Sequence, residues 1–314
     1  MRSARARLVR FLSAWLFVAV APMAAQEPAP SPNGTAASSD LLRIEILGAS
    51  VSAGFVDSPL AGGNKDNASA PLLVPFRRWL EETDAQVKSR ADMMMFLDPI
   101  DRGRLQVDRA VRAKPGMAVA VDFLFWYGYG AVDGPEAAAA DARMARLREG
   151  LEALDRLSCP ILVGDLPDMR GADRRMLQPH QIPTVACLRL LNDEIAAWAK
   201  ARPRVRLFGL ASLVGEMKEK GVRLPAGDYE VPTKPMALLQ SDRLHANRLG
   251  VAYLAFVLHH EVRAALGEEW SDRIPEAGFV AFCSYAGAED ELADQQAKRE
   301  DGKPKAAEPA KSDR

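Results

Sequence analysis

Short apolar runs alternate with longer amphipathic stretches between residues 41 and 285. The apolar runs, which we expect to form strands, are Leu42–Leu47, Met93–Leu97, Met117–Phe125, Ile161–Val163 and Val205–Phe208. The amphipathic stretches, which we expect to form helices, are Pro71–Lys88, Glu136–Leu157, Thr184–Ala201 and Asn247–Leu266. Because such alternation joins parallel strands through helical crossovers, the pattern predicts an α/β fold. We expect a three-layer α/β/α domain with a five-stranded, mostly parallel (flavodoxin-like) sheet.

The N-terminal segment has the composition of an export signal. Four arginines lie within the first ten residues, and the apolar run Phe11–Val20 and several small residues follow them. The run is shorter than the ~20 residues that span a bilayer. We therefore expect residues 1–25 to be a signal peptide and the protein to be exported, either periplasmic or secreted. An uncleaved membrane anchor is the alternative, because Met23 occupies a position where cleavage prefers a small residue.

Two polar segments flank the expected domain. Residues 26–40 contain three prolines and no large apolar side chain, so they cannot bury enough surface to offset the entropy of ordering. Residues 286–314 are rich in acidic and basic side chains and have no aromatic residue. We therefore predict a disordered tether at 26–40, a folded domain at 41–285 and a disordered charged tail at 286–314.

The composition excludes several functional classes. Lys and Arg together number 41 against 42 Asp and Glu, a net charge of -1, so no basic field exists to bind nucleic acid. The three cysteines, Cys159, Cys187 and Cys283, form no C-x-x-C pair, which argues against a disulfide scaffold and a structural zinc site. The adjacent His259 and His260 would point about 100° apart on a helix and could not chelate one ion together. We expect no metal and no organic cofactor, and nothing in the sequence indicates a stable protein partner.

Two polar segments lie where open parallel sheets bind ligands, at the carboxyl ends of strands. The loop Gly48–Gly54 follows the first expected strand and contains Ser50, and it matches neither the P-loop nor the dinucleotide-binding pattern. In the second segment Asp242 precedes His245 by three residues, so its carboxylate can accept the Nδ1 proton and leave Nε2 free as a base. The alternative is that Ser241 or Asp242 caps the helix that follows. We predict that Ser50, Asp242 and His245 form a catalytic triad.

These two segments resemble the opening and closing sequence blocks of the SGNH, or GDSL-type, hydrolases. The matching residues are Gly48, Ser50, Ser52 and Gly54 in the first block and Asp242, His245, Asn247 and Gly250 in the second. The resemblance implies a serine esterase for a carboxylic ester, in which Ser50 is the nucleophile, His245 the general base and Asp242 the residue that orients the imidazole. It also implies an oxyanion hole formed by the backbone N–H groups of Ser50 and, as the match to a further block, Gly103.

The sequence departs from that family at two places. Ala49 stands where the opening block usually has Asp, and no Asn follows the run Met117–Phe125, so one side-chain oxyanion donor is missing. Trp126 or Tyr127 could replace that donor or contact the substrate. The alternative is that these aromatic residues belong to the core.

Two further carboxylates lie near the expected site. Asp165 follows the fourth strand and is a candidate substrate contact, with a solvated or capping role as the alternative. Asp122 lies inside an apolar run, and a buried acid must be paired or hydrogen-bonded. We therefore predict that Asp122 supports the site structurally.

The departures keep two alternatives to ester hydrolysis open. The first is a degenerate SGNH-fold protein that binds a glycan or a lipid in the same cleft. The second is an O-acyltransferase that uses the same triad and replaces water by a sugar hydroxyl. The sequence does not choose among an O-acetylated saccharide, a lipid and a small ester as the substrate.

Overall fold

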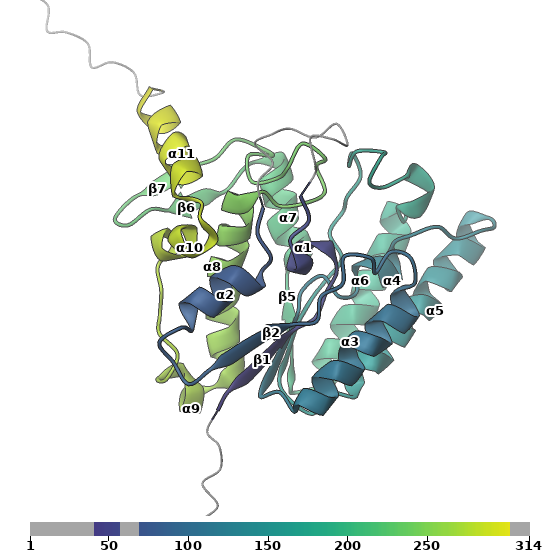
Figure 1. Ribbon diagram of the computed structural model, residues 1–314. Helices are drawn as coiled ribbons and strands as arrows, with labels where there is room; N and C mark the ends of the chain where they lie inside the picture. Colours follow the sequence, from purple (N-terminus) through teal and green to yellow (C-terminus); the bar gives the residue numbers. More distant parts are fainter. Residues whose placement is uncertain (1–40, 57–68, 302–314) are drawn as a thin grey trace, which may run out of the picture. The chain divides into compact units, whose positions relative to one another are not determined.

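A five-stranded parallel sheet forms the centre of the fold (Figure 1). The structure, a computed structural model, describes residues 41–56 and 69–301. The strands are β1 (Arg43–Ile46), β2 (Gln86–Ser89), β3 (Met117–Ala120), β4 (Ile161–Gly164) and β5 (Val205–Phe208). Their spatial order is β2-β1-β3-β4-β5, and all the pairings are parallel. This order is the flavodoxin-like one, so the predicted three-layer α/β/α fold is confirmed.

Successive residues of the interior strands enter opposite apolar layers. In β3, Met117 and Val119 belong to one layer, and Ala118 and Ala120 belong to the other. All four side chains are fully buried. Because both faces of the sheet are covered, these strands read as continuous apolar runs, which is why the sequence pattern located them.

Helices cover both faces of the sheet (Figure 1). The layer that contains Ala118 is covered by α3 (Pro99–Ala113), α4 (Phe125–Gly128), α5 (Glu136–Asp155) and α6 (Val185–Lys200). The opposite layer is covered by α2 (Leu73–Trp79), α8 (Arg248–Leu266) and α10 (Phe279–Ala286). The other elements are α1 (Ser50–Ala53), a 3-10 turn (Pro179–Gln181), α7 (Leu210–Glu219), β6 (Arg223–Pro225), β7 (Glu230–Pro232), α9 (Glu268–Ser271) and α11 (Glu289–Asp301).

The predicted second strand is wrong. Met93–Leu97 forms turns in which Met95 alone is buried. The second strand is β2, which overlaps the end of the stretch predicted as the helix Pro71–Lys88. β2 lies at the edge of the sheet, and of its side chains only Val87 is buried. An edge strand with one buried residue contains no apolar run. The apolar runs that located the interior strands therefore could not locate this one.

The C-terminal tail is also more ordered than predicted. The helix α11 covers the first part of the segment that was expected to be disordered from residue 286. Leu292 is buried in an apolar cluster with residues of the β6–β7 hairpin and α8. Gln296 donates a hydrogen bond of 2.8 Å to the Tyr229 hydroxyl. A single buried apolar residue among many charged ones is too little to predict an ordered helix in so polar a segment. The expected signal peptide and tether, residues 1–40, lie outside the described residues.

One helix of the described part, α8, is long and apolar enough by composition to cross a membrane. Half of that stretch is buried inside the domain. Ala255, Leu258 and Val262 of α8 pack into the apolar layer that also contains Met117 and Val119 of β3. This burial is the arrangement expected of a core helix that covers a sheet in an α/β domain.

Candidate active site

The turn between β1 and α1 holds Ser50 at the first position of α1. The backbone N–H of Gly48 donates to Gln106 Oε1 at 2.8 Å, and Gln106 Nε2 donates to the Gly48 carbonyl at 3.0 Å. A Cβ on Gly48 would lie 2.0 Å from Asp122 Oδ1, so only glycine fits at this position. The turn that holds Ser50, the candidate nucleophile, is therefore fixed from α3 by the Gln106 side chain.

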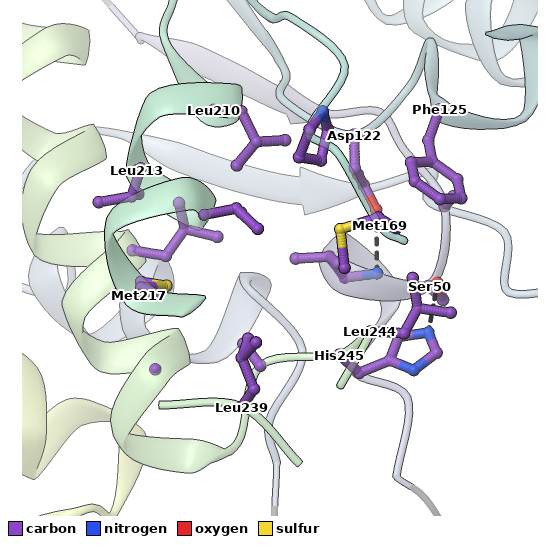
Figure 2. A pocket seen from close by; sticks show the side chains of 17 residues that line it. Ser50, Asp122, Phe125, Met169, Leu210, Leu213, Met217, Leu239, Leu244 and His245 are labelled. Atoms are coloured by element: carbon purple, nitrogen blue, oxygen red, sulfur yellow. Dashed lines mark hydrogen bonds between the residues drawn. The ribbon is translucent and has the colours of Figure 1, made fainter. Parts of the chain in front are cut away.

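The structure brings Ser50, His245 and Asp242 into one hydrogen-bonded chain. Figure 2 shows Ser50 and His245, the two of these residues that line the neighbouring pocket. His245 Nε2 lies 2.8 Å from Ser50 Oγ, and His245 Nδ1 lies 2.6 Å from Asp242 Oδ2. Because a carboxylate only accepts, Nδ1 carries the proton and Nε2 is left to accept the proton of the serine hydroxyl. The arrangement is that of a nucleophile, a base and a residue that orients the base.

Asp242 is fully buried, and its second oxygen, Oδ1, accepts hydrogen bonds from the N–H groups of Leu244 (2.9 Å) and His245 (3.0 Å). Burial by itself would raise the pKa of this carboxyl, but the hydrogen bonds from the His245 ring and from these two N–H groups outweigh burial and lower the pKa below its ordinary value. Asp242 is therefore held as a carboxylate behind the imidazole.

A closed turn presents the histidine. Leu239 and Ala246 form a β-bridge across it, and the N–H of Gln240 donates to the His245 carbonyl at 2.8 Å. The buried Gln240 side chain donates to the carbonyls of Ala246 (2.9 Å) and Phe55 (2.8 Å). The Phe55 ring in turn stacks on the His245 ring, with centroids 4.2 Å apart. Gln240 therefore joins the loop that follows Ser50 to the turn that carries the base.

The cap of α8 is Asn247 and neither Ser241 nor Asp242. Asn247 Oδ1 accepts from the Gly250 N–H at 2.9 Å, while its Nδ2 donates to the Ala237 carbonyl at 2.8 Å. A Cβ on Gly250 would lie 2.1 Å from the Leu238 carbonyl oxygen. The capping alternative for Asp242 is therefore not what the structure contains.

Asp122 supports the nucleophile turn, as predicted. Its Oδ1 accepts from Ser52 Oγ at 2.6 Å, and its Oδ2 accepts from the N–H groups of Val51 (2.9 Å) and Ser52 (3.2 Å). Burial raises the pKa of this carboxyl despite these hydrogen bonds. Ala49, where the related family usually has Asp, is buried in the apolar core. Asp122 thus supplies a carboxylate to this turn from the segment that follows β3 instead.

An apolar pocket with a cavity volume of about 50 Å³ adjoins Ser50 and His245. Of the described residues that line it, only Ser50, Asp122 and His245 have polar side chains. Large apolar side chains make up most of the rest, including Phe125, Met169, Leu210, Leu213, Met217 and Leu239 (Figure 2). The pocket therefore offers a substrate apolar contact everywhere except at the reacting atoms.

The backbone N–H of Ser50 is one candidate oxyanion donor. As the first residue of a helix, Ser50 has an N–H group with no partner inside the helix. The next two N–H groups, of Val51 and Ser52, are already taken by Asp122. No Asn or Gln side chain is among the described pocket residues, so the side-chain donor that the sequence lacks is not replaced there.

Gly103 is not at the site. It lies inside α3, where helical geometry assigns its N–H to the carbonyl four residues before it. A Cβ on Gly103 would lie 2.0 Å from the Tyr127 hydroxyl oxygen. The glycine therefore makes room for a tyrosine at a helix contact, and the predicted oxyanion role of Gly103 is wrong in this structure.

Trp126, Tyr127 and Asp165 also lie outside the pocket lining. Trp126 and Tyr127 are buried in the core layer on the α3–α6 side of the sheet, which is the alternative that the sequence left open. Asp165 accepts a hydrogen bond of 2.6 Å from the Ala211 N–H at the start of α7, and burial raises the pKa of its carboxyl. Asp165 thus holds the first turn of α7 instead of a substrate.

Several supporting residues were missed from the sequence. Gln106 and Phe55 carry no motif, and each acts across a long separation in the chain. The N–H of Asp173, in the loop after β4, donates to the Asp242 carbonyl at 2.8 Å. Among the residues that the structure describes, no group of three or more His, Cys, Asp or Glu side chains could hold a metal ion.

This protein is similar in structure to several solved proteins, but its sequence matches no known family. No protein-family model matches the chain, and no curated protein sequence matches it significantly. A lipase/acylhydrolase from Enterococcus faecalis is 17% identical with a TM-score of 0.41, and the match covers 70% of this chain and 95% of that one. A gut microbial diltiazem-metabolizing enzyme is 11% identical with a TM-score of 0.43, over 69% of this chain and 46% of that one. A salicylyl-acyltransferase from a tetracycline biosynthetic pathway is 17% identical with a TM-score of 0.39, over 74% and 56%. Identities and TM-scores this low do not identify the activity of this chain.

Proposed function

We propose that this protein is an SGNH-type serine esterase that hydrolyses a carboxylic ester. The observation that supports this proposal is the hydrogen-bonded chain from Ser50 Oγ to His245 Nε2, at 2.8 Å, and from His245 Nδ1 to Asp242 Oδ2, at 2.6 Å. Ser50, the first residue of this hydrogen-bonded chain, borders the apolar pocket. A hydroxyl, an imidazole and a buried carboxylate in this order are the groups that nucleophilic acyl transfer requires.

In the proposed reaction, Ser50 Oγ attacks the ester carbonyl carbon while His245 Nε2 takes the hydroxyl proton. The negative charge that develops on the carbonyl oxygen faces the backbone N–H of Ser50. His245 then donates the proton to the leaving alcohol, and an acyl group remains on Ser50. Water, deprotonated by His245, then attacks the acyl carbon. The bond to Ser50 Oγ breaks, the acid is released, and His245 returns the proton to Ser50 Oγ. Asp242 stays ionised throughout and stabilises the imidazolium.

The absence of a side-chain oxyanion donor is expected to slow the reaction without changing its mechanism. Removal of one such donor typically costs about 10²–10³ in kcat. We therefore expect a slow esterase by the standard of enzymes with a complete oxyanion hole. A protein that only binds a glycan or a lipid in this pocket needs no carboxylate behind the imidazole, which favours the catalytic role.

A serine-directed phosphonate tests the proposal. We expect a fluorophosphonate to label Ser50, located by mass spectrometry of the digested protein, and p-nitrophenyl butyrate to be hydrolysed. Ser50→Ala should lose both the label and the activity. The exposed Ser284 on α10 offers a control, since Ser284→Ala should keep both. A label on another serine, or unchanged hydrolysis by Ser50→Ala, would refute the proposal.

The alternative of acyl transfer uses the same acyl-enzyme and differs only in what attacks it. Hydrolysis in the presence of an added sugar or other alcohol, followed by product analysis, separates the two. Esterase activity predicts free acid as the main product at every acceptor concentration. Acyltransferase activity predicts an acylated acceptor and a faster release of p-nitrophenol as acceptor is added.

We also propose that the protein is exported. This rests on the arginine-rich start and the short apolar run that follows it. Fractionation of the source cells followed by mass spectrometry should find the protein outside the cytoplasm and without its first ~25 residues. An intact Met1 in the membrane fraction would mean that the segment is an anchor instead.

A further inference from the structure

The apolar pocket is bordered by one stripe of α7. Leu213, Val214 and Met217 lie three, four and seven residues after Leu210, the spacing that places side chains on one face of a helix. Figure 2 shows Leu210, Leu213 and Met217 on this helix, across the pocket from Ser50 and His245. The stripe packs against core side chains, with Leu210 and Met217 buried, and it also borders the pocket beside Ser50.

The chemistry of the lining selects what can occupy that space. Asp122 is committed to the nucleophile turn by three hydrogen bonds. Only Ser50 and His245 then remain as polar side chains toward a ligand, among the described residues that line the pocket. The hydroxyl groups of a saccharide would lose their water without finding partners in this pocket. A hydrocarbon chain loses nothing and gains apolar contact along its whole length.

We infer that this pocket binds the acyl chain of the substrate, which is therefore an ester of a medium-length, unbranched apolar acid and not an acetate ester. The inference rests on the proposed function, because it places the chain next to an acyl carbon bonded to Ser50. The acyl part stays attached to the serine while the alcohol leaves and water enters, so a pocket lined by apolar side chains suits the part that stays.

The α7 stripe also suggests a chain length. At 1.5 Å per residue, the seven steps from Leu210 to Met217 extend ~10 Å along the helix, about the length of an extended chain of eight carbons. Met217 is almost fully buried at the far end of this stripe. We therefore place the end of the acyl chain near Met217 and its middle near Leu213.

The first test is the dependence of kcat/KM on acyl length. With p-nitrophenyl esters from acetyl to dodecanoyl, each below the concentration at which it aggregates, kcat/KM should rise by up to about fourfold per methylene as far as octanoyl. It should then level off or fall. A flat profile, or fastest hydrolysis of the acetyl ester, would overturn the inference while leaving the esterase proposal intact.

Two variants of α7 locate the chain. Leu213→Trp fills the middle of the pocket and should move the optimum to shorter esters, whereas Met217→Ala opens its end and should move the optimum to longer ones. The exposed neighbour Ser212 gives the matched control, since Ser212→Trp should keep the profile of the unaltered protein. The opposite shifts of the two pocket variants separate a change of pocket length from general damage. If neither variant moves the optimum, the chain does not lie along α7.

A binding measurement separates this inference from the esterase proposal. Ser50→Ala keeps the pocket, and calorimetry should detect octanamide binding to it at concentrations where acetamide does not bind. If no ester is hydrolysed and octanamide still binds better, the pocket inference stands and the esterase proposal fails. If octanamide binds no better than acetamide, the inference is overturned. A series with a fixed octanoyl group and varied alcohols completes the test, because a preference set by the alcohol alone would assign the pocket to the leaving group.

Discussion

The Asp122 carboxylate accepts a hydrogen bond of 2.6 Å from the Ser52 hydroxyl, two residues beyond the candidate nucleophile. Both side chains are buried, and the same carboxylate accepts the N–H groups of Val51 and Ser52. A group in the turn that follows β3 thus fixes the first turn of α1, which carries Ser50. The position of Ser50 therefore depends on a contact between residues 70 positions apart.

Asp122→Asn is expected to lower both stability and kcat. An amide has one acceptor oxygen where the carboxylate has two, so at least one buried donor of the turn loses its partner, at a cost of about 1–3 kcal/mol. Displacement of Ser50 by about 1 Å would lower kcat by roughly 10². Denaturant unfolding and esterase assays measure the two effects, with little change expected in KM.

Asp165→Asn is the matched control for this prediction. Asp165 also holds a helix start, accepting the Ala211 N–H at α7, but it does not line the pocket. It should lose stability without a comparable loss of kcat per folded molecule. Equal losses of kcat in both variants would mean that Asp122 acts only through general stability.

Removal of α11 is expected to destabilise the domain. Leu292 is 5% exposed, and Arg248 of α8 donates to the Gly287 carbonyl at 2.8 Å. We expect Leu292→Ala to cost about 2 kcal/mol, at the low end for a buried leucine because the site lies at the surface of the fold. A chain that ends at residue 285 should unfold at lower denaturant concentration than one that ends at residue 301. Equal midpoints for these two chains would show that α11 contributes nothing.

The sequence located those elements whose signal is local. Interior strands such as β3 and β4 are buried on both faces, so each appears as an apolar run. The Asp-x-x-His spacing located Asp242 and His245 because both partners lie in one turn. In contrast, β2 has one buried side chain and no run.

The residues that position the triad from a distance had no such signal. Gln106 contacts Gly48 across 58 positions, and Phe55 stacks on His245 only once the two ends of the domain meet. Their roles depend on contacts that only the folded chain makes. Neither a hydrophobic repeat nor a short sequence motif predicts such contacts. For the same reason Gly103 was assigned to the wrong role: a glycine in a polar stretch looks the same in a helix contact as in a loop. Its contact with Tyr127 became visible only in three dimensions.

The stability that Asp242 provides is expected to disappear in acid. Its pKa in the folded protein lies below the reference value of 3.8 because the His245 ring and two N–H groups favour the charged form. A carboxyl with a lowered folded-state pKa stabilises the fold fully above its unfolded pKa, and this contribution is lost as the pH falls through the folded value. Asp242→Asn should therefore be less stable by about 1.5–3 kcal/mol at pH 6, and the difference should shrink below about pH 4. Urea unfolding of both proteins between pH 3 and pH 7 measures it. A difference that is constant over this range would mean that the charge of Asp242 contributes nothing to stability.

Ser50, His245 and Asp242 are expected to act as one unit. The serine is a weak nucleophile without its base, and the base loses its tautomer and orientation without the carboxylate. Ser50→Ala and His245→Ala should each lower kcat by about 10⁴–10⁶, and the double variant should be hardly slower than either single one. Asp242→Asn should lower kcat by up to about 10⁴. Steady-state assays on the ester that is hydrolysed fastest, with circular dichroism to verify folding, measure these effects. If the losses of Ser50→Ala and His245→Ala multiply in the double variant, the two residues act independently and the hydrogen bond between them has no catalytic role.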